Sequence, residues 1–473
     1  MLMLGVVSSV SAGGILTNTN QSARFARLMA LDASTGIEAA YYNPAGLSKL
    51  NDGFHFSFSN QSAFQTRAIT TTFPLFEGYG GDATKKFKGT ASAPIIPSIQ
   101  AAYKTGKWVL SGSIAVTGGG GKATFNDGLP SFEGGLSQLP GVINTIGSQL
   151  PADMSLGANK YSADQYMRGS SFIYGGQIGG TYEINNMFSA YGGFRLNIVS
   201  NGYEGHLRNL QANISSEGLS AIGMPDYNGT MANPDPFLQM AIGQTADESQ
   251  KQSLQLLQKA ANDGVFLDCS QSGWGISPII GFNFNYEKLN VGMKYELKTK
   301  LNVENKTKVD DTGMFRNGVN TPHDIPALLT VGASYKVLPK MEVSVGYHRF
   351  FDSDAKMAND KQKHIKGGTN EYLAGVEYRL TDMFLVSAGG QITRYGVKDN
   401  YQSDLSFSID SYSIGFGGAV NVAKNVQINI GYFWTTYSDW TKDISSYAGT
   451  PLAGTDMFSR TNKVFAAGVD FSF

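Results

Sequence analysis

The sequence predicts an all-β fold: a 14-stranded antiparallel transmembrane β-barrel with a small N-terminal helical plug in its lumen. Three observations predict it. From Phe54 onward, apolar and polar residues alternate with a period of two, as strands with two different faces require. Short and long connections between these strands alternate strictly, and aromatic residues gather beside the short ones, as in outer-membrane barrels.

Composition excludes several classes of function. The chain has 473 residues, a formal net charge of −1 and only 16% charged residues, which is low for a soluble protein of this length. A nearly neutral chain gives no electrostatic reason to expect nucleic-acid binding. The single Cys269 excludes an intrachain disulfide and a CxxC redox or metal site, and the five histidines form no cluster. We therefore expect no cofactor and no metal.

Residues 1–12 resemble a secretory signal peptide that is truncated at its start. Leu2–Val7 is apolar, and Val10-Ser11-Ala12 suits a cleavage site of small residues. No positive residue precedes the apolar stretch and the segment is short for an export signal, so a buried N-terminal strand is the alternative. No later run of eighteen apolar residues exists, so we expect no transmembrane helix.

Residues 13–50 differ from the rest of the chain and are expected to form the plug. Phe25, Leu28 and Met29 lie at helical spacing. A segment of this length and low apolar content cannot fold alone. We therefore expect the barrel that follows, residues 51–473, to contain it. The charges of the plug should then pair with charges of the lumen, because a buried unpaired charge is costly.

Two sequence signals predict the local structure of the second half of the plug. Thr35, followed three residues later by Glu38, forms a capping box and predicts a helix start. Asn43 precedes Pro44, which disfavours the helical region for Asn43, while Pro44 is well placed to open a new short helical turn. The plug motif comprises five consecutive residues: Asn43, Pro44, Ala45, Gly46 and Leu47.

The alternation in the strands gives one apolar, aromatic face and one small or polar face. In a membrane barrel the apolar face meets lipid and the polar face meets the lumen, whereas in a soluble sandwich the apolar face meets a second sheet. Alternation alone does not separate these folds, but connection lengths do. The last strand shows the pattern, with an apolar face of Phe465, Ala467, Val469, Phe471 and Phe473.

Connection lengths predict fourteen strands joined by six short turns and seven long loops. Short turns are expected to face the periplasm and long loops the cell exterior. The expected short turns are 104–107, 185–186, 287–289, 338–340, 380–382 and 423–425. The expected long loops are 73–94, 117–160, 207–271, 306–321, 352–366, 398–405 and 439–460, of which 117–160 and 207–271 are the longest.

Aromatic residues flank five of the short turns on the apolar face. Their common height predicts a girdle at one membrane interface, an arrangement that a soluble protein does not need. The residues are Tyr103, Trp108, Tyr182, Phe188, Tyr286, Tyr335, Tyr378 and Phe384.

The chain resembles the FadL family of outer-membrane transporters for long-chain fatty acids and other hydrophobic compounds. The plug motif 43–47 before fourteen strands carries the resemblance, together with Trp274-Gly275 in a strand that ends at Tyr286, and the terminal Phe473. A strand start anchored by a proline within 321–335 also fits. The resemblance covers essentially the whole chain.

This resemblance implies a location in the outer membrane of a Gram-negative bacterium and a channel rather than an enzyme. It also implies that the N-terminal segment is a hatch, that outer loops capture the ligand, and that the ligand leaves sideways through a gap in the third strand. That strand, Trp108–Thr117, runs into glycines that weaken strand pairing. The expected lateral gate is Gly118, Gly119, Gly120 and Gly121.

Charged residues on the lumen face have two interpretations. They can pair with each other and with the plug, which is the commoner role of such charges. Alternatively, Arg195, Lys294 or Arg379 meets the carboxylate of a substrate.

Two long loops contain apolar residues at helical spacing. In the second loop, Thr245 and Glu248 form another capping box. The apolar residues can form a capture groove for the ligand, or they can pack on each other and cover the barrel. The expected substrate-binding residues are Leu136, Leu139, Ile143, Ile146, Leu254 and Leu257.

Three other functions are weighed against transport. An outer-membrane enzyme needs a nucleophile beside a base, but His206, His323 and His364 lie at different loops without a paired serine motif. A surface receptor or adhesin has no need of a plug. A general porin would conduct ions through an open lumen. The expected partners are a hydrophobic ligand, the bilayer and lipopolysaccharide, with no nucleic acid, and the chain is expected to be a monomer.

Overall fold

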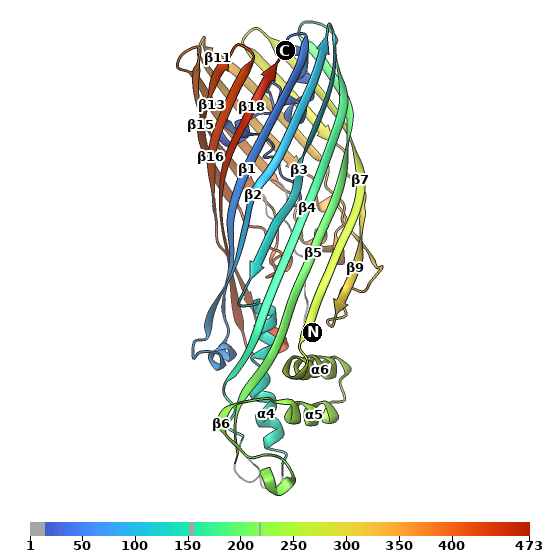
Figure 1. Cartoon of the computed structure of the whole chain (residues 1–473), viewed down its shortest axis with the longest axis vertical. Coiled ribbons are helices and arrows are strands. Elements are labelled where there is room, and N and C mark those ends of the chain that lie inside the picture. The colour runs from blue at the N-terminus through green and yellow to red at the C-terminus, as the bar shows by residue number, and fades with distance from the viewer. Residues whose placement is uncertain (1–14, 151–155, 217–218) are drawn as a thin grey trace.

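The computed structural model describes residues 15–150, 156–216 and 219–473, which form one closed antiparallel β-barrel of fourteen strands (Figure 1). The barrel closes because β1 (Gly53–Thr72) pairs with β2 (Thr84–Thr105) on one side and with β18 (Gly454–Ser472) on the other. The predicted signal peptide, 1–12, lies outside the described residues.

Some of the fourteen strands are interrupted. β8 with β9, β10 with β11, and β16 with β17 are successive segments of single strands, and β6 is a short addition that pairs with β5. The segments are β3 (Trp108–Phe125), β4 (Tyr161–Glu183), β5 (Phe188–Ser216), β6 (Tyr227–Ala232), β7 (Val265–Tyr286), β8 (Leu289–Glu296), β9 (Asn302–Asp310), β10 (Asn320–Pro322), β11 (Leu328–Leu338), β12 (Met341–Phe350), β13 (Asn370–Arg379), β14 (Phe384–Arg394), β15 (Ser411–Ala423), β16 (Val426–Tyr437) and β17 (Trp440–Ile444).

The six short turns lie where the sequence predicts them. Most long loops are shorter than predicted, whereas the connections 351–369 and 395–410 are longer than the predicted 352–366 and 398–405. The interval 73–94 contains the first half of β2, and 207–271 contains the end of β5 and the start of β7. At this end of the barrel the alternation continues with Phe87 buried and the flanking Lys86 and Lys88 exposed. Where a strand extends beyond the membrane, its outer face meets water and can carry charged residues. The position at which outward apolar residues end therefore marks the edge of the membrane and not the end of the strand.

The plug contains two short α-helices and one 3₁₀ helix inside the barrel. They are α1 (Ala23–Leu28), α2 (Ala39–Tyr42) and η1 (Pro44–Lys49), so the helical spacing and the turn at Pro44 are confirmed. The capping box of Thr35 and Glu38 is wrong. Glu38 precedes α2 without capping it, because its carboxylate accepts hydrogen bonds from Ser34 and Arg24 instead.

Four loop helices gather at the end of the barrel opposite to the short turns (Figure 1). They are α3 (Pro130–Leu136), α4 (Leu139–Gly147), α5 (Asp235–Gln244) and α6 (Glu248–Asn262). The capping box of Thr245 and Glu248 is wrong, because Asp247 caps α6 and accepts from the Gln250 amide at 2.8 Å. Short 3₁₀ helices complete the loops: η2 (Pro74–Gly78), η3 (Leu219–Ile222), η4 (Asp352–Asp354), η5 (Ala358–His364), η6 (Asp399–Tyr401) and η7 (Tyr447–Gly449).

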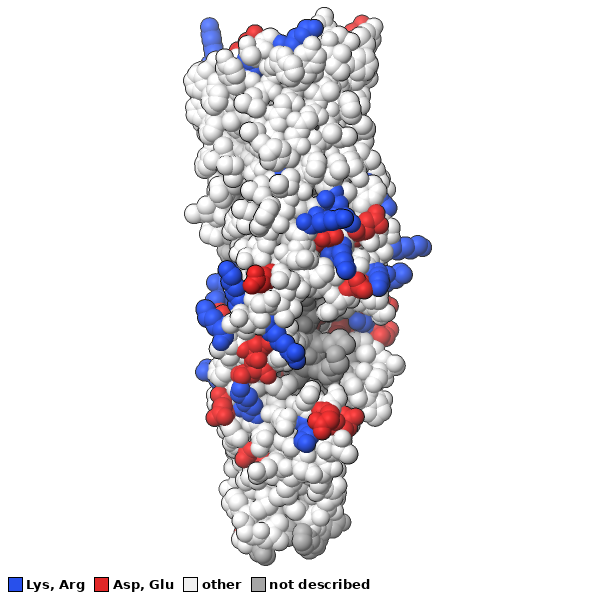
Figure 2. All heavy atoms as spheres, turned by 90° about the vertical axis from the view of Figure 1, so that its right-hand side faces the viewer, with Lys and Arg blue, Asp and Glu red and all other residues white. Residues whose placement is uncertain are grey.

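The outer surface divides into a charge-poor band and a charged half. On the face that Figure 2 shows, a band almost without charged side chains lies below a thin charged rim, whereas Lys, Arg, Asp and Glu are frequent further down, above a lower end with few charges. All eight aromatic residues predicted beside the short turns are exposed, as a girdle in contact with lipid requires. Among residues 15–150, 156–216 and 219–473, no helix is both long and apolar enough to cross a membrane.

Candidate functional site: plug, pocket and wall opening

The plug motif 43–47 is held against the wall by β4, β5 and β7. Its backbone carbonyls accept hydrogen bonds from wall hydroxyls, and Leu47 is fully buried. These contacts fix the turn at Asn43-Pro44 against the wall. The three bonds run from Asn43 Nδ2 to Asn283 Oδ1 (2.7 Å), from Thr181 Oγ1 to the Pro44 carbonyl (2.7 Å) and from Ser189 Oγ to the Ala45 carbonyl (2.7 Å).

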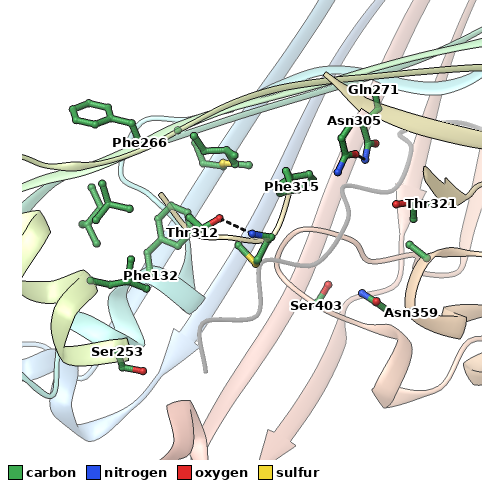
Figure 3. Close-up of a pocket in the computed structure, with 18 of the residues that line it drawn as sticks. Phe132, Ser253, Phe266, Gln271, Asn305, Thr312, Phe315, Thr321, Asn359 and Ser403 are labelled. Atoms are coloured by element: carbon green, nitrogen blue, oxygen red, sulfur yellow. Dashed lines mark hydrogen bonds between the residues drawn. The ribbon is translucent and has the colours of Figure 1, made fainter. Parts of the chain in front are cut away.

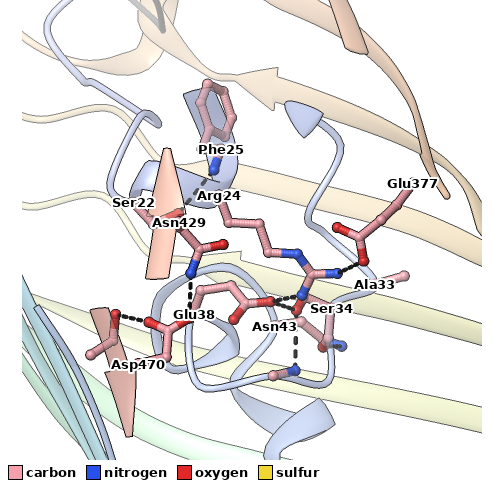
Figure 4. A network of polar contacts seen from close by, with 12 residues as sticks. Ser22, Arg24, Phe25, Ala33, Ser34, Glu38, Asn43, Glu377, Asn429 and Asp470 are labelled. Carbon is pink, nitrogen blue, oxygen red and sulfur yellow. Dashed lines mark hydrogen bonds and ion pairs between the residues drawn. The ribbon is translucent and has the colours of Figure 1, made fainter. Parts of the chain in front are cut away.

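Two arginines anchor the plug electrostatically. Arg27 is buried, with Nη1 2.6 Å from Glu377 of β13 and Nη2 2.9 Å from Asn429 of β16. Arg24 lies between Glu377, at 3.3 Å, and Glu38 of the plug itself (Figure 4). The predicted pairing of plug and lumen charges is therefore confirmed for these residues.

A buried histidine makes a second polar link between plug and wall. His348 of β12 has Nε2 2.9 Å from Asp32 of the plug and Nδ1 2.7 Å from Glu371 of β13. All three side chains are buried. The imidazole can donate to a carboxylate on each side, so it joins the plug to two neighbouring strands.

The structure brings together two of the three predicted substrate-binding cations. Arg195 and Lys294 lie 2.6 and 2.7 Å from the same carboxylate, Glu296, and Lys294 also donates to the Tyr41 carbonyl at 2.8 Å. Arg379 is exposed at the end of β13, beside a short turn. Lys294 therefore bonds directly to the plug, and the Arg195 guanidinium lies 4.8 Å from the ring centre of Tyr41 in the plug. A substrate contact for any of the three stays a prediction.

The wall is interrupted between β2 and β3. Pairing that starts at the short turn ends at Ile99 and Ile114, and it resumes at Ala91 and Ala123. Between these pairs the two strands are not hydrogen-bonded to each other. We call this unpaired stretch, 92–98 of β2 with 115–122 of β3, the wall opening.

Both sides of the wall opening carry residues that weaken pairing. Residues 92–98 include Pro94 and Pro97, which have no amide hydrogen to donate. Residues 115–122 include the four glycines 118–121, and pairing of this stretch with β4 shifts register twice. The interruption therefore has a local chemical cause on both strands.

The plug pairs with β3 at the first two of these glycines. Thr17 forms an isolated bridge with Gly118, and the Gly119 amide donates to the Leu16 carbonyl at 3.1 Å. A Cβ on Gly118 would lie 2.2 Å from that carbonyl oxygen. Gly119 has a φ of +90°, and a Cβ there would lie 2.3 Å from the Ser171 carbonyl. Close approach of the backbones thus requires glycine at both positions.

A cavity of about 280 Å³ occupies the wall opening. Its inner lining includes Asn20 of the plug and the buried Val464 of β18. Its outer lining includes Ile95, which is 75% exposed, and Tyr174, which is 46% exposed. The cavity therefore joins the lumen to the outer surface of the barrel.

A larger cavity of about 820 Å³ lies among the long loops, and we call it the loop pocket (Figure 3). α6, β7, the connection 311–319, η5 and η6 surround it. Polar groups such as Gln271 and Asn305 occupy one side. Its apolar lining comes from Phe132, Met167, Leu256, Val265, Leu267, Met314 and Phe315.

The six apolar loop residues predicted to bind substrate lie together in one hydrophobic core. Five are buried and the sixth is partly buried, so their side chains face each other rather than an open groove. The loop pocket instead lies along the side of α6 that carries Gln252 and Leu256. Ligand binding by the predicted set stays a prediction: Leu136, Leu139, Ile143, Ile146, Leu254 and Leu257.

Several residues that line the loop pocket were not predicted from the sequence. Met314 and Phe315 are the only adjacent apolar pair in the mostly polar stretch 306–321, and this contrast is a usable signal. His206 and His364, which belong to different loops in the sequence, line the same pocket.

Comparisons with known proteins find similarity in structure. No family model matches the chain, and no curated protein matches it in sequence. The structure of a Pseudomonas aeruginosa FadL homologue matches with a TM-score of 0.65 and 12% identity, covering 98% of this chain and 100% of that one. The Pseudomonas putida toluene transporter TodX matches with a TM-score of 0.53 and 14% identity, covering 99% and 100%. This chain has their fold.

Proposed function

We propose that this protein is an outer-membrane channel of the FadL type that takes up hydrophobic small molecules. The ligand is captured in the loop pocket and released sideways into the membrane through the wall opening. The observation that carries the proposal is the wall opening itself, because a channel that discharged into the periplasm would need no gap in its wall. The similar structures named above are those of a FadL homologue and a toluene transporter, which agrees with a hydrophobic ligand.

Lateral release has a thermodynamic reason. Each methylene group moved from an apolar site into water costs roughly 0.8 kcal/mol. A long acyl chain released into the periplasm would therefore cost on the order of 10 kcal/mol. Delivery into the lipid beside the barrel avoids that cost, and the exposed Ile95 and Tyr174 border such an exit.

The outer surface supports a location in the outer membrane of a Gram-negative bacterium. The charge-poor band and the aromatic girdle fit lipid, and closure leaves no strand edge in the hydrocarbon. In this placement the short turns face the periplasm, and the long loops face the exterior and lipopolysaccharide. A single chain closes the barrel, so we propose a monomer.

The plug argues against the two alternative functions. An adhesin or receptor gains nothing from a segment bonded through buried charges to β12, β13 and β16. A general porin would leave the lumen open, whereas Arg27 and Asp32 fix the plug across it. Single-channel recording separates the cases, because a plugged barrel should pass little steady current.

Filling the wall opening tests the proposal. Ala93 lines its cavity, so Ala93→Trp places an indole in the exit, while Ala374→Trp places one on the exposed face of β13 as a matched control. We expect Ala93→Trp to lower the rate of uptake of radiolabelled oleate or toluene at least about tenfold, because the indole raises the free-energy barrier to release. Ala374→Trp should leave the rate unchanged. Both variants should keep the heat-modifiable mobility of a folded barrel. Normal uptake by folded Ala93→Trp would refute lateral release.

A further inference from the structure

Two arginines face each other across the seam that closes the barrel. Arg67 of β1 and Arg460 of β18 are direct cross-strand partners, and they are 2% and 7% exposed. Like charges directly opposite each other destabilise a sheet, and burial adds to the cost. The two positive charges gain nothing from facing each other, so their pairing calls for a functional explanation.

Lys361 of η5 and Lys442 of β17 extend the pair into a region of positive charge. The charges of Arg67 and Lys442 act on Lys361 of η5. Burial, reinforced by these neighbouring cations, lowers the pKa of the Lys361 amine to about 7. We call Arg67, Arg460 and Lys361 the cation cluster.

Aromatic rings support each member of the cation cluster. Such rings attract a cation and present a flat apolar surface beside it. A cation on a ring therefore offers both a charge for an anionic head and a surface for an apolar tail. The distances to the ring centres are 4.4 Å from Arg67 to Phe407, 4.3 Å from Lys361 to Tyr401 and 5.0 Å from Arg460 to Tyr437.

Neutral groups supply the hydrogen bonds of Arg460 and Lys361. Arg460 donates to Gln65 Oε1 at 3.2 Å, and Lys361 donates to the Ser406 carbonyl at 3.1 Å. Within the described ranges 15–150, 156–216 and 219–473, neither cation forms an ion pair with a carboxylate, and the buried Nε of Arg460 has no hydrogen-bond partner.

Asp404 supplies the negative charge that acts on Lys361. The Asp404 carboxylate attracts Lys361 electrostatically, but its two oxygens accept hydrogen bonds from the Ser131 and Leu405 amides, both at 2.9 Å. One carboxylate offsets only one of the three cations, so the cluster keeps an excess of positive charge on the lumen side of β1 and β18.

The cluster lies between the two cavities. Lys361 and Tyr401 line the loop pocket, while Gln65, the acceptor for Arg460, lines the cavity of the wall opening. A ligand that moved from one cavity to the other along this side of the lumen would pass these cations. Guanidinium groups bind carboxylates with two parallel hydrogen bonds, so a pair of arginines can hold such a head securely.

We propose that Arg67, Arg460 and Lys361 form a transit site for the anionic head, a carboxylate or sulfonate, of an amphiphile that passes from the loop pocket to the wall opening. This inference rests on the proposed function and narrows its substrate class. Neutral hydrocarbons would make no use of the site. The apolar tail contacts the aromatic rings, whether it enters before or after the head. The head pairs with the arginines before the molecule reaches the membrane.

Binding of a charged and a neutral ligand of equal length tests this site. The purified full chain in a nonionic detergent is titrated calorimetrically with decanoate and with decanol. The double variant Arg67→Gln/Arg460→Gln should lose at least about tenfold in decanoate affinity and less than about twofold in decanol affinity. Arg168→Gln, which removes a half-exposed arginine paired with Glu204, is the control and should change neither.

The outcomes separate this inference from the proposed function. The transit site is refuted if the double variant loses affinity for decanoate and decanol equally, or if its affinity for decanoate is unchanged. Wild-type protein that binds decanol but shows no preference for decanoate also overturns it, yet leaves uptake of hydrophobic molecules standing. Wild-type protein that binds neither ligand overturns both. The double variant must keep the heat-modifiable mobility of a folded barrel and bind decanol, so misfolding cannot imitate the expected result.

Discussion

Two seams flank the hairpin of β1 and β2, and they differ sharply. At the closing seam, β1 pairs with β18 without a register shift from His55 with Ser472 to Thr72 with Thr455. At the neighbouring seam, pairing of β2 with β3 stops and then resumes further along the chain. The seam between the most distant parts of the chain is thus continuous, and the seam between adjacent strands is open.

The difference teaches that residue chemistry, not sequence separation, decides where the barrel opens. From Phe54 to Thr72, β1 contains neither glycine nor proline. The open seam has two prolines in 92–98 and four glycines in 115–122. Proline removes a donor and glycine weakens a strand, so both sides of this seam lose pairing energy.

The same plug braces both seams. At the closing seam the Ala23 amide donates to Ser59 of β1 at 3.2 Å. At the open seam the Gly119 amide donates to the Leu16 carbonyl. Closure and opening can therefore be disturbed separately by changing different plug contacts.

Removing the main electrostatic anchor of the plug should have the largest effect. Arg27→Gln leaves Glu377 with Arg24 as its only ion-pair partner in the described part of the chain. It should lower the free energy of unfolding by roughly 2–4 kcal/mol, because the charge-assisted hydrogen bonds of Arg27 to Glu377 and Asn429 are lost. Arg24→Gln should cost less, since Arg24 is more exposed and its closest contact, Glu38, belongs to the plug itself. Denaturant-induced unfolding measures both. Equal costs would show that Arg27 is not the main anchor.

Substitution at the contact between plug and open seam should have a smaller effect. Gly118→Ala places a Cβ 2.2 Å from the Leu16 carbonyl and should cost about 1–3 kcal/mol by overpacking. It should also make Leu16–Asn18 accessible to protease while the closing seam stays intact. In the matched variant Gly180→Ala, the nearest atom to the new Cβ lies 4.0 Å away. Protease resistance in Gly118→Ala equal to that of Gly180→Ala would contradict the brace.

The pH dependence of anion binding tests the role of the closing seam, which carries Arg67 and Arg460. The pKa of Lys361 is lowered to about 7, so its positive charge is present below that pH and lost above it. Arg67, Lys442 and Asp404 also act electrostatically on the Lys361 amine. Affinity for decanesulfonate, which stays anionic, should fall about three- to tenfold between about pH 6 and about pH 8.5.

Calorimetric titration across this pH range measures the effect. Lys361→Gln should give a flat profile at the lower affinity. A profile with the same slope in this variant would assign the titration to another group.

Much of the fold could be predicted from sequence, because strand alternation and turn chemistry are local. The six short turns, the girdle that includes Trp108 and Tyr182, and the start of η1 at Pro44 follow from such signals. The long-loop ends could not be predicted, because strands that leave the membrane lose their apolar outer face, as Lys86 and Lys88 show.

The site was harder to predict, because it depends on contacts between distant segments. The four glycines 118–121 indicate a weak strand, but the prolines on the facing strand matter equally, and only cross-strand register shows that they face the gap. The pairing of Arg67 with Arg460 joins residues nearly four hundred positions apart. Helical spacing found the loop helices but could not show that Leu139 and Ile143 point into a core.

Photolabelling during uptake tests the lateral path most directly. Whole cells that produce the protein are given a fatty acid with a diazirine near its tail and are illuminated, and the modified peptides are mapped by mass spectrometry. The path proposed here predicts labels in the loop pocket and at the wall opening, in residues 91–97, 116–122 and 172–174. Labels in the loop pocket and at the short turns, with none at the wall opening, would contradict it.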